Sequence, residues 1–277
     1  MIRRLVQQAI GWERMSRIER YTWRYRFDRR LGALIAPLPI PLAWLLRYYG
    51  SDKQQPGQHS YGPIYGELFR GRKYRRIRLL EIGIGGYDDK PGGRSLLAWC
   101  AWFPFGTIIA GDIEPKQFLA GGRCRIHRID QSSTADLAAL CHQEAPFDII
   151  IDDGSHFSRH QIFTFRVLFD ALAEDGIYVI EDVQTSFWPG EVNRTVWDGA
   201  ILGDPRFRDT CYGWFLDLAA LLNHAEFFDH AGIDPEKLAL ARRIRRIGFA
   251  HNLIIIWKGV NVESSNYIRH AAATAAA

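Results

Sequence analysis

The chain has 277 residues, of which 47% are hydrophobic and 24% are charged, and its net charge is +4. This composition predicts a packed globular protein with one large domain, or one domain with an appendage. Its four cysteines form no C-x-x-C pair, which argues against a zinc knuckle or a disulfide framework and favours a reducing, cytoplasmic location.

Residues 1–48 are interpreted as a short helical N-terminal arm that is basic and aromatic. They contain ten arginines and three acids, so the arm carries a charge of +7 and the rest of the chain −3. Because a nucleic-acid enzyme more often carries its positive charge around the active cleft, we expect no nucleic-acid partner. The arm is expected either to pack on the catalytic domain or on a second subunit of a homo-oligomer, or to contact an anionic membrane surface peripherally.

The most apolar stretch, residues 31–46, is short for a membrane span, and Pro37, Pro39 and Pro41 would break a helix within it. The Arg-rich segment before it lacks the long apolar core of a signal peptide. We therefore expect neither a transmembrane helix nor a signal peptide.

From residue 77 onward, short apolar runs alternate with helical patterns. Gly176 is expected to stop the helix that begins at residue 161. An antiparallel edge hairpin is expected to turn near His251 and Asn252. Strands are predicted in 77–86, 107–115, 124–132, 147–156, 177–186 and twice in 243–259, and helices in 95–103, 134–144, 161–176 and within 210–228.

This alternation predicts an α/β fold with a doubly wound, mostly parallel sheet, an antiparallel edge hairpin, and helices on both faces. In such a sheet, ligands bind beyond the carboxyl ends of the strands. We interpret residues 49–270 as this domain and residues 271–277 as a disordered tail.

The first of these strands ends in the glycine turn EIGIGG, residues 81–86, whose glycines let the backbone approach a ligand closely. Asp112 ends the second strand, where a carboxylate accepts hydrogen bonds from ribose hydroxyls. Asp130 and Gln131 follow the third strand and are placed to read an adenine edge. Glu81 beside the turn disfavours a phosphate, whereas an acidic site suits a cofactor with an amino group and a sulfonium.

Two acidic pairs end the fourth and fifth strands: Asp152 with Asp153, and Glu181 with Asp182. If the two strands are neighbours, four carboxylates share one crevice, and their repulsion favours a divalent cation. Oxygen ligands suit magnesium, manganese or calcium rather than zinc. His156 lies three residues after Asp153 and is placed to act as a general base toward an alcohol.

Simpler interpretations of these residues stay open. Asp153 or Ser155 fits the N-cap of the following helix. His156 and His160 form an H-x-x-x-H pair that chelates zinc in other proteins, although His160 is better interpreted as a helix-surface residue.

The combination D-D-G-S-H followed by E-D-V-Q-T-S, with E-x-G-x-G-G and D-Q before it, resembles the class I S-adenosylmethionine-dependent methyltransferases. Within that fold it is similar to the metal-dependent macrolide-sugar (mycinamicin and macrocin type) and rhamnosyl O-methyltransferases and to cephalosporin-hydroxylase-like proteins. The resemblance implies a seven-stranded Rossmann-like sheet with a reversed edge hairpin, with S-adenosylmethionine and Mg²⁺ (or Mn²⁺) as cofactors.

The resemblance also implies residue roles. His156 becomes the catalytic base, and Asp153, Glu181 and Asp182 become the metal ligands. A G-S-D-K segment near residue 50, which otherwise fits a polar loop, covers the cofactor and substrate in that family and adds Lys53, with Ser51, Asp52, His59 and Tyr61 as further candidates. The expected cofactor-binding residues are Lys53, Glu81, Gly83, Gly85, Asp112, Asp130, Gln131 and Asp152.

We therefore expect a metal-dependent O-methyltransferase that acts on a hydroxyl of a sugar or a glycosylated metabolite. Phe187, Trp188 and Trp197 are candidates to stack on a sugar ring, although ordinary packing explains them equally well. The alternatives are a catechol-type O-methyltransferase, a nucleic-acid methyltransferase, and a non-catalytic scaffold with the same fold.

Overall fold

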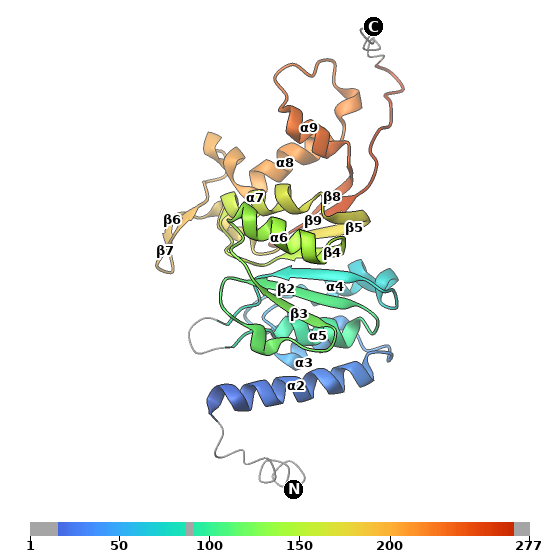
Figure 1. Ribbon diagram of the computed structural model, residues 1–277. Helices are drawn as coiled ribbons and strands as arrows, with labels where there is room; N and C mark the ends of the chain where they lie inside the picture. Colours follow the sequence, from blue (N-terminus) through green and yellow to red (C-terminus); the bar gives the residue numbers. More distant parts are fainter. Residues whose placement is uncertain (1–15, 87–90, 269–277) are drawn as a thin grey trace. The chain divides into compact units, whose positions relative to one another are not determined.

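The structure is a computed structural model that describes residues 16–86 and 91–268. The chain divides into two compact units, Met1–Asp130 and Gln131–Ala277, which are described separately below (Figure 1). Seven strands have the sheet order β3-β2-β1-β4-β5-β9-β8. This is the predicted α/β fold with a mostly parallel sheet and an antiparallel edge pair.

The first unit has a parallel ladder in which β1 pairs with β2 and β2 pairs with β3. The burial of β1 and β2 is nearly continuous, as expected for parallel strands covered on both faces, whereas buried and more exposed residues alternate along the edge strand β3. Its elements are α2 (Arg17–Ile35), α3 (Leu42–Tyr49), α4 (Gly62–Phe69), η2 (Arg70–Arg72), β1 (Arg78–Ile82), α5 (Arg94–Trp102), β2 (Thr107–Asp112), η3 (Gln117–Leu119) and β3 (Cys124–Arg128).

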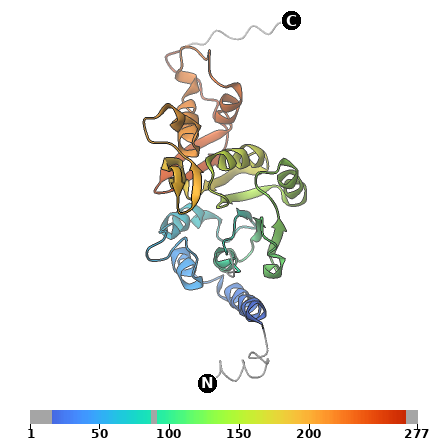
Figure 2. The ribbon, with the colours of Figure 1, turned by 90° about the vertical axis from the view of Figure 1, so that its left-hand side faces the viewer.

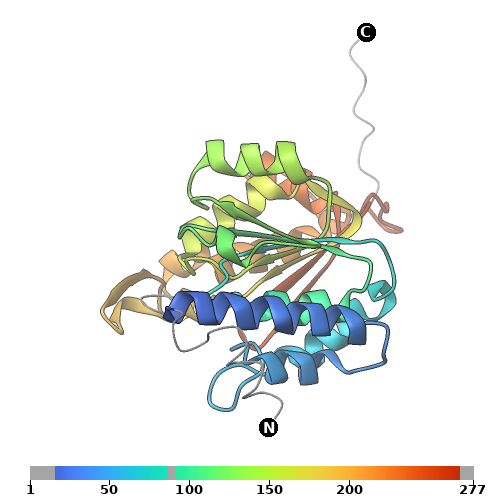
Figure 3. The same cartoon turned by 60° about the horizontal axis from the view of Figure 1, so that its bottom comes forward.

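Helix α2 begins with a capping box in which the Ser16 hydroxyl accepts from the Glu19 N–H and the Glu19 carboxylate accepts from the Ser16 N–H. It ends before the three prolines, which were predicted to break a helix, and α3 begins directly after Pro41. Both helices contact α5, and α2 is the long blue helix in Figure 3. Gly32 permits this approach, because a Cβ there would lie 3.1 Å from the Ala101 side chain.

In the second unit, β4 pairs with β5 in parallel, while β9 runs antiparallel to both β5 and β8. Helix α7 contacts both α6 and α8, and α6 and α7 lie next to each other in Figure 2. The elements are α6 (Thr134–Glu144), β4 (Phe147–Asp152), α7 (Ser158–Leu168), β5 (Leu172–Ile180), η4 (Val183–Phe187), β6 (Pro189–Val192), β7 (Thr195–Asp198), η5 (Pro205–Asp209), α8 (Cys211–Leu221), η6 (His224–Glu226), α9 (Pro235–Ala241), β8 (Ile244–Ala250) and β9 (Leu253–Lys258).

Two hairpins belong to this unit. The predicted edge hairpin is confirmed, with Asn252 in the left-handed region (φ 59°) at the turn between β8 and β9. The second hairpin, β6–β7, was not predicted, and it projects away from the rest of its unit in Figures 1 and 3. Its two turn residues, Asn193 and Arg194, both have positive φ (52° and 65°), as a type I′ turn requires.

The predicted end of the helix at Gly176 is wrong. Helix α7 ends at Leu168, and Leu172 already pairs with Phe147 of β4. The ladder shifts register before Ile177, so the extra residues of β5 form an irregularity that contains Gly176. A Cβ at Gly176 would lie 2.6 Å from Leu172 Cγ, so the glycine serves this tight strand segment rather than a helix end.

Within residues 16–86 and 91–268, no helix has the length and apolar character needed to cross a bilayer. The predicted disordered tail, residues 271–277, lies outside the described residues.

Candidate functional site

The carboxyl ends of β4 and β5 lie side by side. Asp152 and Ile180 are register partners in the parallel ladder, and the Glu181 N–H donates to the Asp152 carbonyl at 2.9 Å. Asp153 and Asp182 follow directly along the two strands. The neighbouring arrangement that the sequence analysis required for the two acidic pairs is therefore present.

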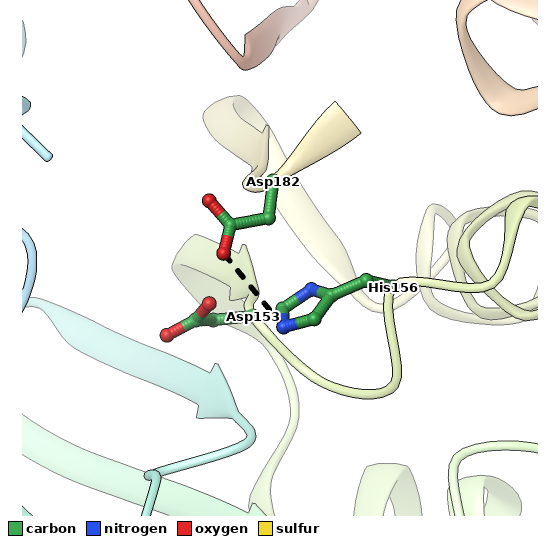
Figure 4. Close-up of side chains that lie close together, drawn as sticks. All are labelled: Asp153, His156 and Asp182. Atoms are coloured by element: carbon green, nitrogen blue, oxygen red, sulfur yellow. Dashed lines mark ion pairs between the residues drawn. The ribbon is translucent and has the colours of Figure 1, made fainter. Parts of the chain in front are cut away.

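Asp153, His156 and Asp182 lie together at this edge (Figure 4). One ligand atom from each residue lies within 4.8 Å of the others, and His156 Nε2 is 3.8 Å from Asp182 Oδ2. All three residues are half-buried. His156 (φ 60°) and Asp182 (φ 55°) both adopt the left-handed conformation, which non-glycine residues rarely adopt unless the surrounding structure holds them there.

Buried side chains hold the backbone of this cluster in place. The Thr185 hydroxyl donates to the His156 carbonyl at 2.7 Å and approaches the Asp182 carbonyl at 3.3 Å. The Gln161 amide donates to the Glu181 carbonyl at 2.9 Å. Sequence reasoning assigned no role to Thr185 or Gln161. Thr185 belongs to the quoted E-D-V-Q-T-S motif, but nothing in the sequence shows that it bridges two strained residues.

Gln131 organises the loop that follows β4. Its amide nitrogen donates to Asp152 Oδ1 (3.2 Å) and Thr164 Oγ1 (3.1 Å), and its amide oxygen accepts from the Ser155 N–H (2.6 Å). A Cβ at Gly154 would lie 2.1 Å from Gln131 Oε1. The glycine of D-D-G-S-H is therefore required by the approach of Gln131, a residue that the sequence analysis predicted to read adenine.

Asp152 is fully buried and lies among neutral donors. Its Oδ1 accepts from the Gln131 amide and the Gly154 N–H, while its Oδ2 has no hydrogen-bond partner in the structure. Burial raises the pKa of this carboxyl to about 7, against the lowering effect of those two donors.

The N-cap interpretation of the D-D-G-S-H loop is wrong, because the N-cap residue of α7 is Phe157 and neither Asp153 nor Ser155 caps this helix. His160 belongs to α7 and is partly exposed, and its Nδ1 lies 2.8 Å from the Ser155 hydroxyl. Among the described residues, His160 is not part of the candidate metal-binding group of Asp153, His156 and Asp182, so the interpretation of the H-x-x-x-H pair as a zinc site has no support.

In the first unit, the carboxylate of Glu81 is buried against a lysine. Lys53 Nζ lies 3.2 Å from Glu81 Oε1, and both side chains are at most 1% exposed. Ser95 Oγ and Trp99 Nε1 donate to the other oxygen at 2.8 and 3.0 Å. Burial raises the pKa of Glu81, while Lys53 and these two donors lower it. Two predicted cofactor residues thus form an internal ion pair.

Asp112 ties the glycine turn to the end of β2. Its Oδ2 accepts from the Ile84 N–H at 3.0 Å and from Lys116 Nζ at 2.8 Å, and its Oδ1 accepts from the Glu114 N–H at 2.8 Å. Lys116 also donates to the Gly85 carbonyl. Gly83 and Gly85 have φ values of 76° and 61°, so the turn uses the conformations that glycine permits.

The predicted site residues are therefore distributed over both units. Glu181 is 1% exposed, and its carboxylate is not part of the group formed by Asp153, His156 and Asp182. Lys53, Glu81, Gly83, Gly85, Asp112 and Asp130 belong to the first unit, and Gln131, Asp152, Asp153, His156, Glu181 and Asp182 belong to the second.

The donor set of the cluster fits a hard divalent cation. Asp153 and Asp182 offer carboxylate oxygens at the ends of adjacent strands, and such ligands suit Mg²⁺ and Mn²⁺. His156 adds a nitrogen, which magnesium binds less readily than oxygen. The arrangement can hold a cation between two carboxylates and keep an imidazole beside it.

No protein-family model matches the chain. The chain is 37% identical over 221 residues to 8-demethyl-8-alpha-L-rhamnosyl tetracenomycin-C 2'-O-methyltransferase of Streptomyces olivaceus, covering 79% of this chain and 55% of the relative. It is 37% identical over 207 residues to demethylmacrocin O-methyltransferase of Streptomyces fradiae, covering 74% and 50%. It is 35% identical over 208 residues to mycinamicin VI 2''-O-methyltransferase of Micromonospora griseorubida, covering 74% and 49%.

Among solved structures, the chain is similar to the methyltransferase MycE from the mycinamycin biosynthetic pathway in complex with Mg, SAH and mycinamycin VI. The TM-score is 0.70 and the sequence identity 32%, over 82% of this chain and 56% of that chain. A second MycE structure, in complex with Mg and SAH, gives a TM-score of 0.73. The chain thus spans about half the length of the relatives that it matches.

Proposed function

We propose that this chain, a homologue of the macrolide- and tetracenomycin-sugar O-methyltransferases with the class I methyltransferase fold, transfers the methyl group of S-adenosylmethionine to a hydroxyl of a sugar or glycosylated metabolite. The observation that carries this proposal is the cluster of Asp153, His156 and Asp182 at the ends of two neighbouring strands. It combines the acids that a divalent cation needs with the base that an alcohol needs.

In this mechanism, Asp153 and Asp182 would hold Mg²⁺ or Mn²⁺, with Glu181 as a third proposed ligand. A bound divalent cation supplies Lewis-acid chemistry that orients sugar oxygens and lowers the pKa of a hydroxyl. His156 accepts the hydroxyl proton as the oxygen attacks the methyl carbon, and the carbon–sulfur bond breaks to release S-adenosylhomocysteine. The Asp182 carboxylate, 3.8 Å from His156 Nε2, stabilises the imidazolium that results.

The cofactor proposal rests mainly on the first unit. Gly83 and Gly85 open the turn for close approach. Asp112 at the end of β2 accepts two hydrogen bonds at Oδ2 and one at Oδ1, so Oδ1 has a further lone pair for a ribose hydroxyl. We also assign Lys53, Glu81, Asp130, Gln131 and Asp152 to the cofactor side. Titration of the Asp112→Asn variant with S-adenosylmethionine tests this assignment, because wild-type affinity in that variant would contradict it.

The overall function is tested by isothermal titration calorimetry with S-adenosylmethionine, without and with magnesium. We expect cofactor binding and a magnesium-binding heat that Asp153→Ala abolishes, while Asp170→Ala, which changes an exposed acid of the same unit, keeps it. Cofactor binding without a metal site would refute the metal-dependent mechanism. Absence of cofactor binding would favour a non-catalytic scaffold.

The acceptor is tested with compounds taken from the names of the relatives. Mycinamicin VI, demethylmacrocin and 8-demethyl-8-alpha-L-rhamnosyl tetracenomycin-C present sugar hydroxyls, and a simple catechol provides the comparison. Methylation of a glycoside but not of catechol supports the proposal. The reverse result would favour the catechol-type alternative.

The proposed partners and location concern the exposed face of α2. Phe27 is 54% exposed and Leu34 is 78% exposed, and the exposed Arg30 lies between them. We propose that this face joins a homo-oligomer, with peripheral membrane contact as the alternative occupant. Sedimentation velocity tests the first, and co-sedimentation with anionic vesicles tests the second.

We also propose that the protein is cytoplasmic, which agrees with its four free cysteines, and that residues 49–270 form the catalytic domain.

A further inference from the structure

The β6–β7 hairpin connects the two sides of the proposed catalytic cluster. The chain leaves Asp182 through η4 into β6, turns at Asn193 and Arg194, and returns along β7 to Asp198. There the Asp198 carboxylate accepts hydrogen bonds from the N–H groups of Ser158 (2.8 Å) and Arg159 (3.1 Å) at the start of α7. The hairpin segment thus begins at Asp182, a proposed metal ligand. It ends at Asp198, which binds the backbone at Ser158, two residues after the proposed base His156.

These hydrogen bonds provide a cap that the helix does not supply for itself. The N-cap residue of α7 is Phe157, which has no side-chain oxygen, so the first N–H groups depend on Asp198. A carboxylate at a helix N-terminus is also favoured by the helix dipole. The Arg159 guanidinium adds a contact of 3.3 Å to the same carboxylate, at a largely exposed position.

The turn that carries His156 is consequently held from two directions. On one side the Thr185 hydroxyl binds the His156 carbonyl, and on the other Asp198 fixes the backbone of residues 158 and 159. His156 has a φ of 60°, a conformation that relaxes when nothing holds it. Loss of either anchor is therefore expected to change the position of the imidazole relative to Asp182.

A row of aromatic rings accompanies this anchor. The Trp197 ring lies 5.2 Å from the Phe157 ring and 5.8 Å from the Trp188 ring, and its Nε1 donates to the Val192 carbonyl at 3.2 Å. All three rings are half-buried. Such rings offer an apolar face for the C–H face of a sugar, and the row adjoins the His156 turn through Phe157.

We propose that Asp198 is a positioning residue that fixes the β6–β7 hairpin onto the His156 turn, so that the aromatic row around Trp197 binds the acceptor sugar at a constant distance from the base. This inference rests on the proposed function. It assigns acceptor recognition to the hairpin, and it assigns to Asp198 an effect on turnover that is exerted through His156.

The kinetic test uses 8-demethyl-8-alpha-L-rhamnosyl tetracenomycin-C as the acceptor. Asp198→Ala is expected to lower kcat up to about 100-fold with little change in the acceptor KM, because small displacements of a reacting group have effects of that size. Asp198→Asn, which keeps one acceptor oxygen, is expected to restore part of kcat. Trp197→Ala is expected to raise the acceptor KM instead.

Asp204→Ala is the matched control. Asp204 also accepts from a backbone N–H at a helix start, that of Arg206 at 2.8 Å, and pairs with an arginine, but it caps η5. It is expected to leave kcat within twofold of wild type. Equal losses in Asp198→Ala and Asp204→Ala, or an unchanged kcat in Asp198→Ala, would overturn the proposal.

Amide hydrogen exchange measured by NMR provides a readout that needs no acceptor. In Asp198→Ala, exchange at Ser158 and Arg159 is expected to accelerate roughly 5- to 30-fold, the range that corresponds to loss of a helix cap. The wild-type rate at both amides would overturn the proposal even if the protein methylates nothing. Failure of wild-type protein to methylate any acceptor, with the expected exchange result, would refute the proposed function and leave the anchoring by Asp198 intact.

Discussion

The two units treat acids at the ends of their strands in opposite ways. In the first unit, Glu81 lies 3.2 Å from Lys53 and Asp112 lies 2.8 Å from Lys116, so each carboxylate is compensated by an ammonium group of the same unit. In the second unit, Asp152 is held by neutral amide donors, and Asp182 lies against the imidazole of His156. The strand-end acids thus contact ammonium groups in the first unit, and neutral donors or an imidazole in the second.

An acid at the end of a strand therefore does not by itself indicate a metal site. Glu81 and Asp112 use their carboxylates to shape the glycine turn and its surroundings through internal hydrogen bonds. Asp153 and Asp182 form a group suited to an added cation. We therefore expect a divalent cation to bind at the strand-end acids of the second unit rather than at those of the first.

The largest effect is expected for His156→Ala. Loss of a general base lowers the rate roughly 10²- to 10⁴-fold, whereas the two carboxylates proposed to hold the cation stay in place. Turnover and magnesium affinity should be measured in parallel. Retention of magnesium binding supports the role of a base, and loss of magnesium binding would make His156 a metal ligand instead.

Lys53→Met should affect stability rather than metal binding. The substitution leaves the Glu81 carboxylate fully buried beside an apolar chain, and removal of one partner from a buried ion pair costs about 3–5 kcal/mol. Chemical denaturation measures the loss. The matched control is Arg166→Ala, which breaks an ion pair with Glu236 in which both side chains are about half exposed, and a much smaller change is expected there.

Gly154→Ala should disturb the second unit through Gln131. A Cβ would lie 2.1 Å from Gln131 Oε1, and this overpacking is expected to cost about 1–3 kcal/mol and to reduce activity as the loop shifts. Gly71→Ala provides the comparison, because a Cβ there meets nothing within 4 Å. Similar free energies of unfolding of the two variants would show that the Gln131 side chain can move away from the added Cβ without a loss of stability.

A pH dependence of stability is expected from Asp152. Its folded-state pKa of about 7 lies above the value of about 3.9 for an unfolded aspartate, so the folded protein retains a proton that the unfolded chain has released. The contribution of Asp152 to stability is therefore complete below about pH 4 and is lost as the pH rises toward 7.

Asp152→Asn should remove this dependence. The free energy of unfolding of wild type minus that of the variant is measured at pH 5 and at pH 8 with a chelator present. This difference is expected to be smaller at pH 8. Asp170→Asn, at an exposed position, should show no such trend. A difference that rises with pH would mean that the folded state lowers the pKa of Asp152.

Much of the fold follows from local patterns. The three isoleucines before Asp152 are fully buried in β4, and the apolar run of residues 253–256 forms β9, so continuous apolar runs predicted both strands correctly. The prediction that the helix continues to Gly176 was wrong, because Leu172 pairs with Phe147 of β4 and the residues that follow it form an irregularity in β5 despite their helical pattern. The β6–β7 hairpin was missed, because its strands are short and contain no fully buried residue.

For the site, the sequence provided the residue types and their positions at the strand ends, since the D-D-G-S-H and E-D-V-Q-T-S motifs are local features of the chain. Only the tertiary structure decided which charges meet. Lys53 reaches Glu81 across 28 positions, and Asp198 caps α7 from a position 40 residues after Ser158. Such contacts depend on how distant segments pack, and no local propensity encodes them. Hydrogen bonds and ion pairs between distant residues thus determined which acids pair with a lysine and which form the group proposed to bind a cation.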